Sequence, residues 1–351
     1  SEYGRDEKVM VEFVSANPTG PMHMGNARGG ALGDCLAAVL DKAGYNAWRE
    51  FYVNDAGNQI EKFGCSLESR YLQIFKGDEI EFPEDGYQGE DIKDLAKEYA
   101  DLNGDSLVNV SAEERKKALV GYALPKNIKK MQADMEKYKI FYDKWFFESE
   151  LHKSGAVKAV VDLLTEKGLT YEKDGAVWYK NKEVLTQKLL KEGKSQKYID
   201  NLELKDDVLI RQNGNPTYFT ADIAYHKNKF DRGFTTLIDV WGADHHGHVM
   251  RMKGAMDAIG YDGDKLNVVL MQLVKLVKDG GFLATCSCSH FMTQELLAKT
   301  VKEAAKATHK RLRQVEFRTQ GPDHPILWAN SANVPESYYL KFFIFQVVDE
   351  K

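Results

Sequence analysis

The stretch that decides the fold is residues 9–34, with the sequence VMVEFVSANPTGPMHMGNARGGALGD. Val9–Phe13 is an apolar run of strand length, and it ends in small, polar and Pro/Gly residues. Apolar residues then recur at helical spacing from about Met24 until Gly44. This order predicts a strand, a tight Gly-rich turn and a helix that opens on His-x-Gly.

Such an arrangement is suited to binding a phosphate. The first amides of a helix lack partners within the helix, and an anion can satisfy them. Gly25 allows a nucleotide to lie against the backbone, and His23 can donate to a phosphate oxygen on which charge develops. His-x-Gly alone is a weak signal, because an ordinary strand-to-helix turn with one partly exposed histidine has the same pattern.

The composition is that of a soluble globular protein with one large or two ordinary domains. Of 351 residues, 43% are hydrophobic and 29% are charged, and no apolar run approaches the ~20 residues that a membrane span needs. The four cysteines and a first segment without an apolar core indicate a cytoplasmic protein with reduced thiols and no signal peptide. The net charge of −5 gives no support for nucleic-acid binding but does not exclude a local basic stripe.

The sequence pattern changes twice along the rest of the chain. Residues 66–202 contain several stretches with helical spacing and a hairpin pattern over 170–179. Residues 208–219 have the pattern of a hairpin with an Asn-Gly turn, and a helix, a strand, a helix and a strand are expected from there to about Met271. With the first βαβ unit, these elements predict a doubly wound parallel sheet whose ligands sit at the carboxyl ends of its strands.

Residues 15–28, followed by FYVNDAGNQ at 51–59, closely resemble the arginyl-tRNA synthetases. The resemblance implies an α/β fold, a Rossmann-like doubly wound parallel sheet split by a mostly helical connective insertion. In this class I family the signature is His-x-Gly-His, and this chain has Asn26 in place of the second histidine. Asparagine can still donate a hydrogen bond to a ribose or phosphate oxygen, but it cannot carry charge.

The resemblance also implies the residues that bind ATP. The catalytic residues would be His23 and Asn26. The full ATP site would consist of Pro18, Gly20, His23, Gly25, Asn26, Gly242, Asp244 and His248.

A second implied site selects arginine, whose guanidinium carries five donors in a fixed fork and needs carboxylates and planar acceptors. The residues implied are Glu12, Ser15, Asn17, His23, Tyr218, Asp222 and Asp244. A spacing of four places Tyr218 and Asp222 on one face of a helix. On the residues alone, Asp222 could equally be an N-terminal helix carboxylate favoured by the helix dipole.

The segment 244–248, Asp-His-His-Gly-His, allows an alternative interpretation as a metal site. Three histidines and an aspartate could ligate a divalent metal, so a metallohydrolase that uses His245, His246 and His248 is an alternative. Adjacent histidines in an extended turn tend to point to opposite faces, and the segment resembles the family's second nucleotide-side loop. We therefore predict no metal site.

Residues 284–290, ATCSCSH, depart from the family's pattern. They stand where class I synthetases carry a Lys-Met-Ser-Lys-Ser-like loop, but they contain no lysine. The loss of two charge-assisted phosphate contacts could cost several kcal/mol of transition-state stabilisation. We expect a flexible loop with free thiols here, and a synthetase-like binding protein without catalysis is an alternative function.

Four segments follow from these patterns: the first half of the catalytic domain (1–65), the connective insertion (66–204), the second half (205–283), and a signature-loop region with the start of a C-terminal helical segment (284–351). The anticodon-binding domain is expected to be absent. The implied activity is the formation of arginyl-adenylate from L-arginine and ATP, with transfer of arginine to the 3′ end of tRNA(Arg). We expect ATP and Mg²⁺ as substrate and ion, no tightly bound cofactor, no membrane partner and a monomer. Another His-x-Gly-His nucleotidyltransferase is the remaining alternative.

Overall fold

The computed structural model describes residues 3–241, 246–270, 280–287, 293–307, 310–319 and 340–348. They belong to two compact units, residues 1–270 and 271–351, and each unit is described by itself. Within the described ranges, every helix is too short or too polar to cross a membrane.

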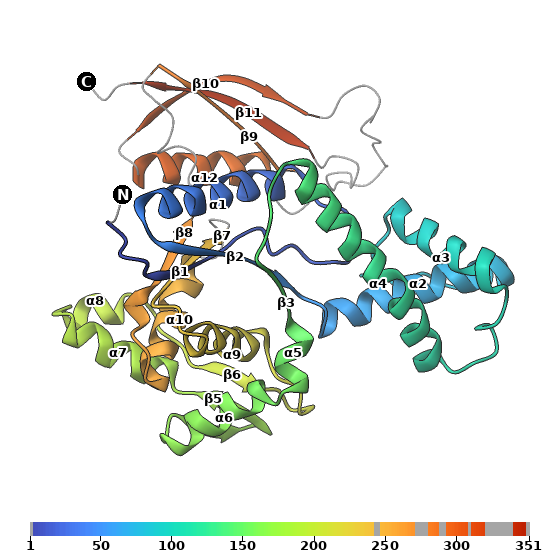
Figure 1. Cartoon of the computed structure of the whole chain (residues 1–351), viewed down its shortest axis with the longest axis horizontal. Coiled ribbons are helices and arrows are strands. Elements are labelled where there is room, and N and C mark those ends of the chain that lie inside the picture. The colour runs from blue at the N-terminus through green and yellow to red at the C-terminus, as the bar shows by residue number, and fades with distance from the viewer. Residues whose placement is uncertain are drawn as a thin grey trace. The chain divides into compact units, whose positions relative to one another are not determined.

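The first unit is built on a five-stranded parallel sheet with the order β3-β2-β1-β7-β8 (Figure 1). Its strands are β1 (Lys8–Glu12), β2 (Asn46–Val53), β3 (Lys144–Phe147), β7 (Thr236–Trp241) and β8 (Leu266–Leu270). The central strand β1 pairs with β2 on one side and with β7 on the other, so that Val11 faces Arg49 and Ile238. The predicted doubly wound α/β fold is confirmed.

Helix α1 (Met24–Ala43) follows β1 as predicted and ends at Gly44, whose left-handed φ of 92° suits a glycine. The helix lies close against the end of β1. A Cβ atom on Gly33 would stand 2.1 Å from Cγ of Phe13, so only glycine fits at this contact.

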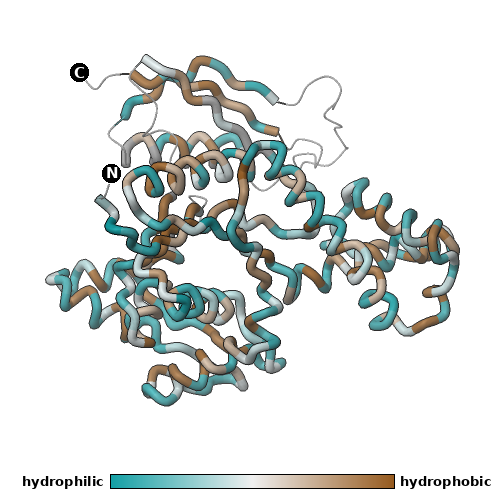
Figure 2. Tube along the Cα trace, viewed as in Figure 1, coloured by the Kyte–Doolittle hydropathy of each residue, from teal (hydrophilic) through white to brown (hydrophobic). Residues whose placement is uncertain are grey.

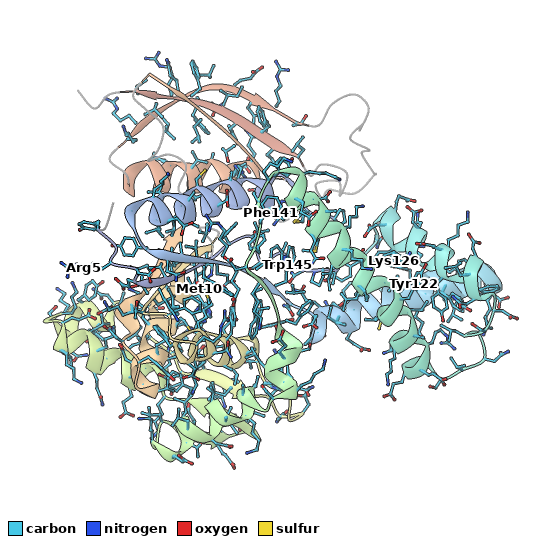
Figure 3. The ribbon with its side chains drawn as sticks, viewed as in Figure 1. Arg5, Met10, Tyr122, Lys126, Phe141 and Trp145 are labelled. Carbon is cyan, nitrogen blue, oxygen red and sulfur yellow. The ribbon has the colours of Figure 1, made fainter. Side chains whose placement is uncertain are left out.

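An arm of three helices stands beside the sheet (Figure 1). It consists of α2 (Asn58–Lys76), α3 (Glu90–Asn103) and α4 (Ala112–Lys137), with the short turn η1 (Gly77–Glu79). Apolar and polar residues alternate along the three helices (Figure 2). The apolar ones pack into a core of the arm that includes Phe63, Leu67, Tyr71, Ile92 and Leu119. On the side of α4 that faces α3, Lys126 lies over the ring of Tyr122 at 4.6 Å (Figure 3) and pairs with Glu98 of α3.

The connective insertion is mostly helical, as expected, and it also contributes strands. The predicted boundary at residue 66 falls inside α2, because Phe63 and Leu67 are buried in one continuous helix face. The sequence Lys-Trp-Phe-Phe of β3 returns to the central sheet, where Trp145 stacks on Phe51 with 4.1 Å between ring centroids. The insertion as bounded at 66–204 therefore includes an edge strand of the main sheet.

A smaller antiparallel sheet, β4-β5-β6, completes this part of the chain. The predicted hairpin is confirmed as β4 (Thr170–Lys173) and β5 (Ala176–Tyr179), and the third strand is β6 (Asp207–Ile210). The hairpin expected at 208–219 is confirmed up to Thr217: the chain returns antiparallel to β6 through the bridge from Ile210 to Pro216, and the amide of Thr217 donates to the carbonyl of Leu209 at 2.9 Å. The helices around this sheet are α5 (Glu148–Lys153), α6 (Ala156–Glu166), α7 (Asn181–Lys191) and α8 (Gln196–Asp200).

Two helices on the second half of the main sheet agree with the sequence pattern. They are α9 (Tyr218–Asp231) and α10 (His246–Ile259), and the turn η3 (Gly263–Lys265) leads from α10 into β8. Ile223, Met252 and Met256 are buried with Leu237 in the largest apolar cluster, which joins the two sheets.

The described residues of the second unit form a three-stranded antiparallel sheet, β10-β11-β9, and the helix α12. Its elements are β9 (Phe282–Ser287), α12 (Gln294–Ala307), β10 (Arg311–Arg318) and β11 (Lys341–Val348). The flexible loop predicted from residue 284 is therefore wrong up to Ser287: Leu283 is buried with Phe343 and Phe345, and β9 pairs with β11. Residues 288–290 and 320–339 lie outside the described residues, so the start of a C-terminal helical segment within 284–351 stays a prediction.

Candidate functional site

The chain makes a sharp turn immediately after β1. Val14 and Ser15 both have left-handed backbone angles, with φ of 71° and 43°, which non-glycine residues adopt only at some cost. This turn returns the Ser15 hydroxyl to Glu12, to which it donates at 2.7 Å, while it accepts from the amide of Tyr52 at 3.1 Å. The predicted residues Glu12 and Ser15 are thus in direct contact at the sheet edge.

The start of α1 presents His23 to solvent in a defined orientation. Nδ1 of His23 accepts from the amide of Gly25 at 3.1 Å, and Oδ1 of Asn26 accepts from the amide of His23 at 2.9 Å. Because Nδ1 is an acceptor, the neutral ring carries its proton on Nε2, which is left to donate outward. A Cβ atom at position 25 would approach Cε1 of His23 to 2.8 Å, so this packing depends on glycine.

The loop between β1 and α1 is fixed from the side of the arm. The Asn127 side chain donates to the carbonyl of Pro18 at 2.9 Å, and Gly20 lies near Asp91 of α3. Asn17 is exposed, whereas its neighbour Pro18 is buried. The loop therefore keeps one predicted polar side chain accessible beside a buried backbone anchor.

A cavity of about 880 Å³ opens beside the carboxyl end of β2. It is enclosed by the first turns of α2, α5 and α9 and by the loop after β6. Its lining residues are Ala56, Gly57, Asn58, Glu61, Glu148, Ser149, His152, Lys153, Arg211, Asn213, Asn215, Pro216, Thr217, Tyr218 and Ala221. Of the predicted site residues, Tyr218 lines this cavity.

Glu148 is a buried carboxylate of the cavity that the sequence analysis missed. It accepts from the Tyr52 hydroxyl at 2.8 Å, and its other oxygen is 3.3 Å from Nε2 of His152. Burial raises its pKa, which the hydrogen bonds from Tyr52 and His152 only partly offset. Glu148 directly follows β3, so an assignment of residues 144–147 as a strand would have placed it at the ligand-binding edge.

Asp222 lies near Glu148 and is held by His248. Nε2 of His248 donates to Oδ2 of Asp222 at 3.1 Å. Burial first, and then the charges of Glu148 and Asp222, raise the pKa of Tyr52 far above its usual range, so both carboxylates act on one hydroxyl. We refer to these two carboxylates and Tyr218 as the acidic pocket; Glu148 and Tyr218 line the cavity, and Asp222 lies near Glu148.

The described structure joins the predicted residues only in small sets: Glu12 with Ser15, Asp222 with His248, and a third set at the start of α1. His23, Gly25 and Asn26 contact one another at the start of α1, and no hydrogen bond between described residues joins them to Tyr218 or Asp222. Gly242 and Asp244 lie outside the described residues.

The alternative of a metal site gains no support. His245 lies outside the described residues, and the described side chain of His248 is engaged with Asp222. Among the residues whose placement is described, no three His, Cys, Asp or Glu side chains could hold a metal ion together.

Comparison with known proteins gives a consistent picture. The family described as tRNA synthetases class I (R), catalytic domain, matches residues 1–318. The chain is 58% identical over 279 residues to the arginine–tRNA ligase of Ruminiclostridium cellulolyticum, covering 79% of this chain and 46% of the relative. It is 54% identical over 326 residues to that of Caldanaerobacter subterraneus subsp. tengcongensis, covering 92% and 53%. The chain thus spans about half the length of the curated relatives it matches.

Solved structures of arginyl-tRNA synthetases are also similar to this chain. A crystal structure from Campylobacter jejuni assigned as an arginyl-tRNA synthetase matches with a TM-score of 0.64 and 38% identity, over 75% of this chain and 54% of that one. The arginyl-tRNA synthetase of Thermus thermophilus, at 20% identity and a TM-score of 0.54 over 75% and 48%, shares the fold.

Proposed function

The chain belongs to the family of class I tRNA synthetases (R), catalytic domain, and from that membership we propose that it is the catalytic core of an arginyl-tRNA synthetase. It would activate L-arginine with ATP and transfer the arginyl group to the 3′ end of tRNA(Arg). The proposal includes Mg²⁺ accompanying ATP, a monomeric state and a cytoplasmic location.

The observation that carries the proposal is the acidic pocket of Glu148 and Asp222. A guanidinium is planar, always charged and suited to two carboxylates at once. The raised pKa of Glu148, caused by burial, indicates a carboxylate that lacks a full counter-charge in the free protein. A bound guanidinium would supply that charge, and Tyr218, which is 42% exposed, offers its ring at the cavity wall.

ATP would bind at the start of α1. Nε2 of His23 can donate, since Nδ1 accepts from Gly25, and no hydrogen bond joins Nε2 to another described residue. The side-chain amide nitrogen of Asn26 is likewise directed away from its bond to the His23 backbone, because that bond uses Oδ1. Donors at a helix N-terminus favour the charge that develops on phosphate oxygens.

The chemistry requires no covalent enzyme intermediate. An oxygen of the arginine carboxylate attacks the α-phosphorus of ATP, the bond to the bridging oxygen breaks, and pyrophosphate leaves. The 3′-terminal ribose hydroxyl of tRNA then attacks the carbonyl carbon of the adenylate, and AMP leaves. Positioning and charge stabilisation supply the catalysis.

The proposal is tested by calorimetry with L-arginine and L-lysine. Wild type should bind arginine in preference to lysine, and Asp222→Ala should lose that preference. Asp231→Ala is the matched control, because Asp231 ends the same helix and pairs with Lys227 at 2.6 Å. Equal binding of arginine and lysine by wild type would refute the pocket assignment and favour another nucleotidyltransferase.

A further inference from the structure

A small cavity lies at the amino end of the main sheet, away from the candidate functional site. Its volume is about 300 Å³, and its lining residues are Lys8, Asn46, Trp48, Arg232 and Phe234. Lys8 begins β1 and Asn46 begins β2, whereas the larger cavity opens beyond the carboxyl end of β2. Because β2 is eight residues long, the two cavities are separated by roughly 20 Å. Of the described residues, none lines both.

The floor of this cavity is a part of the sheet that α9 leaves uncovered. Alternate residues of a strand point to one face of the sheet. On this face β1 and β2 present two pairs in register, which are Lys8 with Asn46 and Met10 with Trp48. Met10, labelled in Figure 3, is buried with residues of α9 in the largest apolar cluster. The helix ends at Asp231, and Lys8 and Asn46 remain exposed.

Two aromatic rings form the walls of the cavity. The ring centroids of Trp48 and Phe234 are 5.9 Å apart, with an angle of 55° between the ring planes. The Trp48 indole donates to the Glu50 carboxylate at 2.9 Å, and this bond orients its ring. The guanidinium carbon of Arg232 lies 5.2 Å from the Phe234 centroid and 5.8 Å from that of Trp48. The apolar walls are therefore preformed, as they usually are in sites for small ligands.

The lining residues include two cations and no acid, but the two cations differ in their contacts. Arg232 donates with both terminal nitrogens to the buried carboxylate of Glu50, so it serves mainly to hold the wall. Lys8 forms no ion pair with a residue that the structure describes, and the Asn46 side chain forms no hydrogen bond with one. An anion in the cavity could accept from Lys8 and Asn46 without displacing an existing contact.

We propose that this cavity binds a small aromatic acid, which is a planar ring that carries one carboxylate or phosphate group. The ring would pack against Trp48 and Phe234, since aromatic rings attract one another in stacked and edge-to-face arrangements. The anionic group would accept from Lys8 and Asn46. The volume is at the lower limit of about 300 Å³ for small-molecule sites, which restricts the ligand to about one ring. This ligand is neither the amino acid nor the nucleotide of the proposed function.

The test is an NMR titration of the whole chain with benzoate, phenyl phosphate and benzyl alcohol. The two acids should bind with a Kd of about 1 mM or tighter, and the neutral alcohol at least about tenfold more weakly. The acid that binds more tightly identifies the preferred anion. Lys8→Met should weaken both acids about tenfold and leave benzyl alcohol unchanged. Lys117→Met, at an exposed lysine of the arm, is the matched control and should leave all three constants unchanged.

Recognition of the ring is tested separately. Phe234→Leu keeps an apolar side chain but removes the ring, and it should weaken both acids and benzyl alcohol by a similar factor. Inorganic phosphate provides the same test without a variant, and should bind at least about tenfold more weakly than phenyl phosphate.

Four results would overturn the proposal. The first is the absence of binding of either acid, and the second is binding that Lys8→Met leaves unchanged. The third is inorganic phosphate that binds as tightly as phenyl phosphate. The fourth is displacement of the acids by ATP or L-arginine, which would assign them to the candidate functional site instead.

Discussion

Nε2 of His248 lies 3.1 Å from Oδ2 of Asp222, and this hydrogen bond joins the first turn of α10 to α9. The His248 ring is itself held between Phe219, at 5.6 Å between ring centroids, and Trp241, at 5.4 Å. The orientation of the proposed specificity carboxylate is therefore determined by an aromatic environment on neighbouring elements. The contact also connects the second half of the sheet to the acidic pocket.

His248→Ala should weaken arginine binding about tenfold, which corresponds to roughly 1.4 kcal/mol, because Asp222 loses an orienting donor. Calorimetry would measure the effect. If His248 acts through Asp222, the double variant with Asp222→Ala should bind no more weakly than Asp222→Ala alone. Additive losses would show that His248 contributes independently.

Arginine binding should depend on the protonation of Glu148. Burial raises the pKa of this carboxyl above its ordinary value of 4.5, and a guanidinium binds the ionised form. Affinity should therefore decrease as the pH falls through the raised pKa, by about tenfold per unit below it. Glu148→Gln should bind weakly and without this pH dependence. Glu150→Gln, at the exposed Lys144 pair, is the control and should behave as wild type.

Glu148→Gln should not destabilise the ligand-free protein at neutral pH. A carboxyl whose pKa is higher folded than unfolded contributes stability at low pH, and that contribution is lost as the pH rises through the folded pKa. Glu148→Gln removes the buried charge that remains above this range. Urea unfolding at pH 7 should give a free energy at least equal to that of wild type, and a clear decrease would contradict this account.

Substitution of Arg115 should destabilise the arm without acting on the proposed arginine pocket. Arg115 is buried in the arm, where it donates to the carbonyls of Leu107 and Val110 and pairs with Glu68 at 2.6 Å. Arg115→Met leaves a half-buried carboxylate and carbonyl groups without donors, and should cost roughly 3–5 kcal/mol in urea unfolding. The exposed Lys117→Met should change stability by less than about 0.5 kcal/mol.

The change from glycine to alanine should affect stability in opposite directions at two positions. Gly33→Ala forces a methyl group against Phe13 and should destabilise the protein by about 1–3 kcal/mol. Gly121→Ala meets nothing within 4 Å in the middle of α4 and should stabilise by about 0.5–1 kcal/mol. Thermal melting of the two variants would show both directions, and a stabilised Gly33→Ala would refute the close packing of α1 on β1.

Long periodic segments were predictable from the sequence, and short or distant relationships were not. The first βαβ unit, α9 and the 170–179 hairpin follow from local spacing alone. Strand β3 has only four residues between two helices, so its place in the sheet, and with it Glu148, depends on pairing with β2. Lys229 meets Glu12 across 217 residues, a contact that only the order of the strands creates. At β9, pairing with a strand some 60 residues later overrides a loop-like local composition.

Helix α9 carries Asp222, His226 and Lys229 along one side, so residues on successive turns serve both the proposed arginine pocket and the main sheet. This arrangement restricts how amino-acid preference can diverge. A helix transplanted from an enzyme with another preference would have to bring its own cation for Glu12 and Asp239, to which Lys229 donates, or two adjoining anions would be stranded in the interior. Changes of preference in this scaffold should therefore arise at Glu148 and the cavity wall sooner than by exchange of α9 as a module.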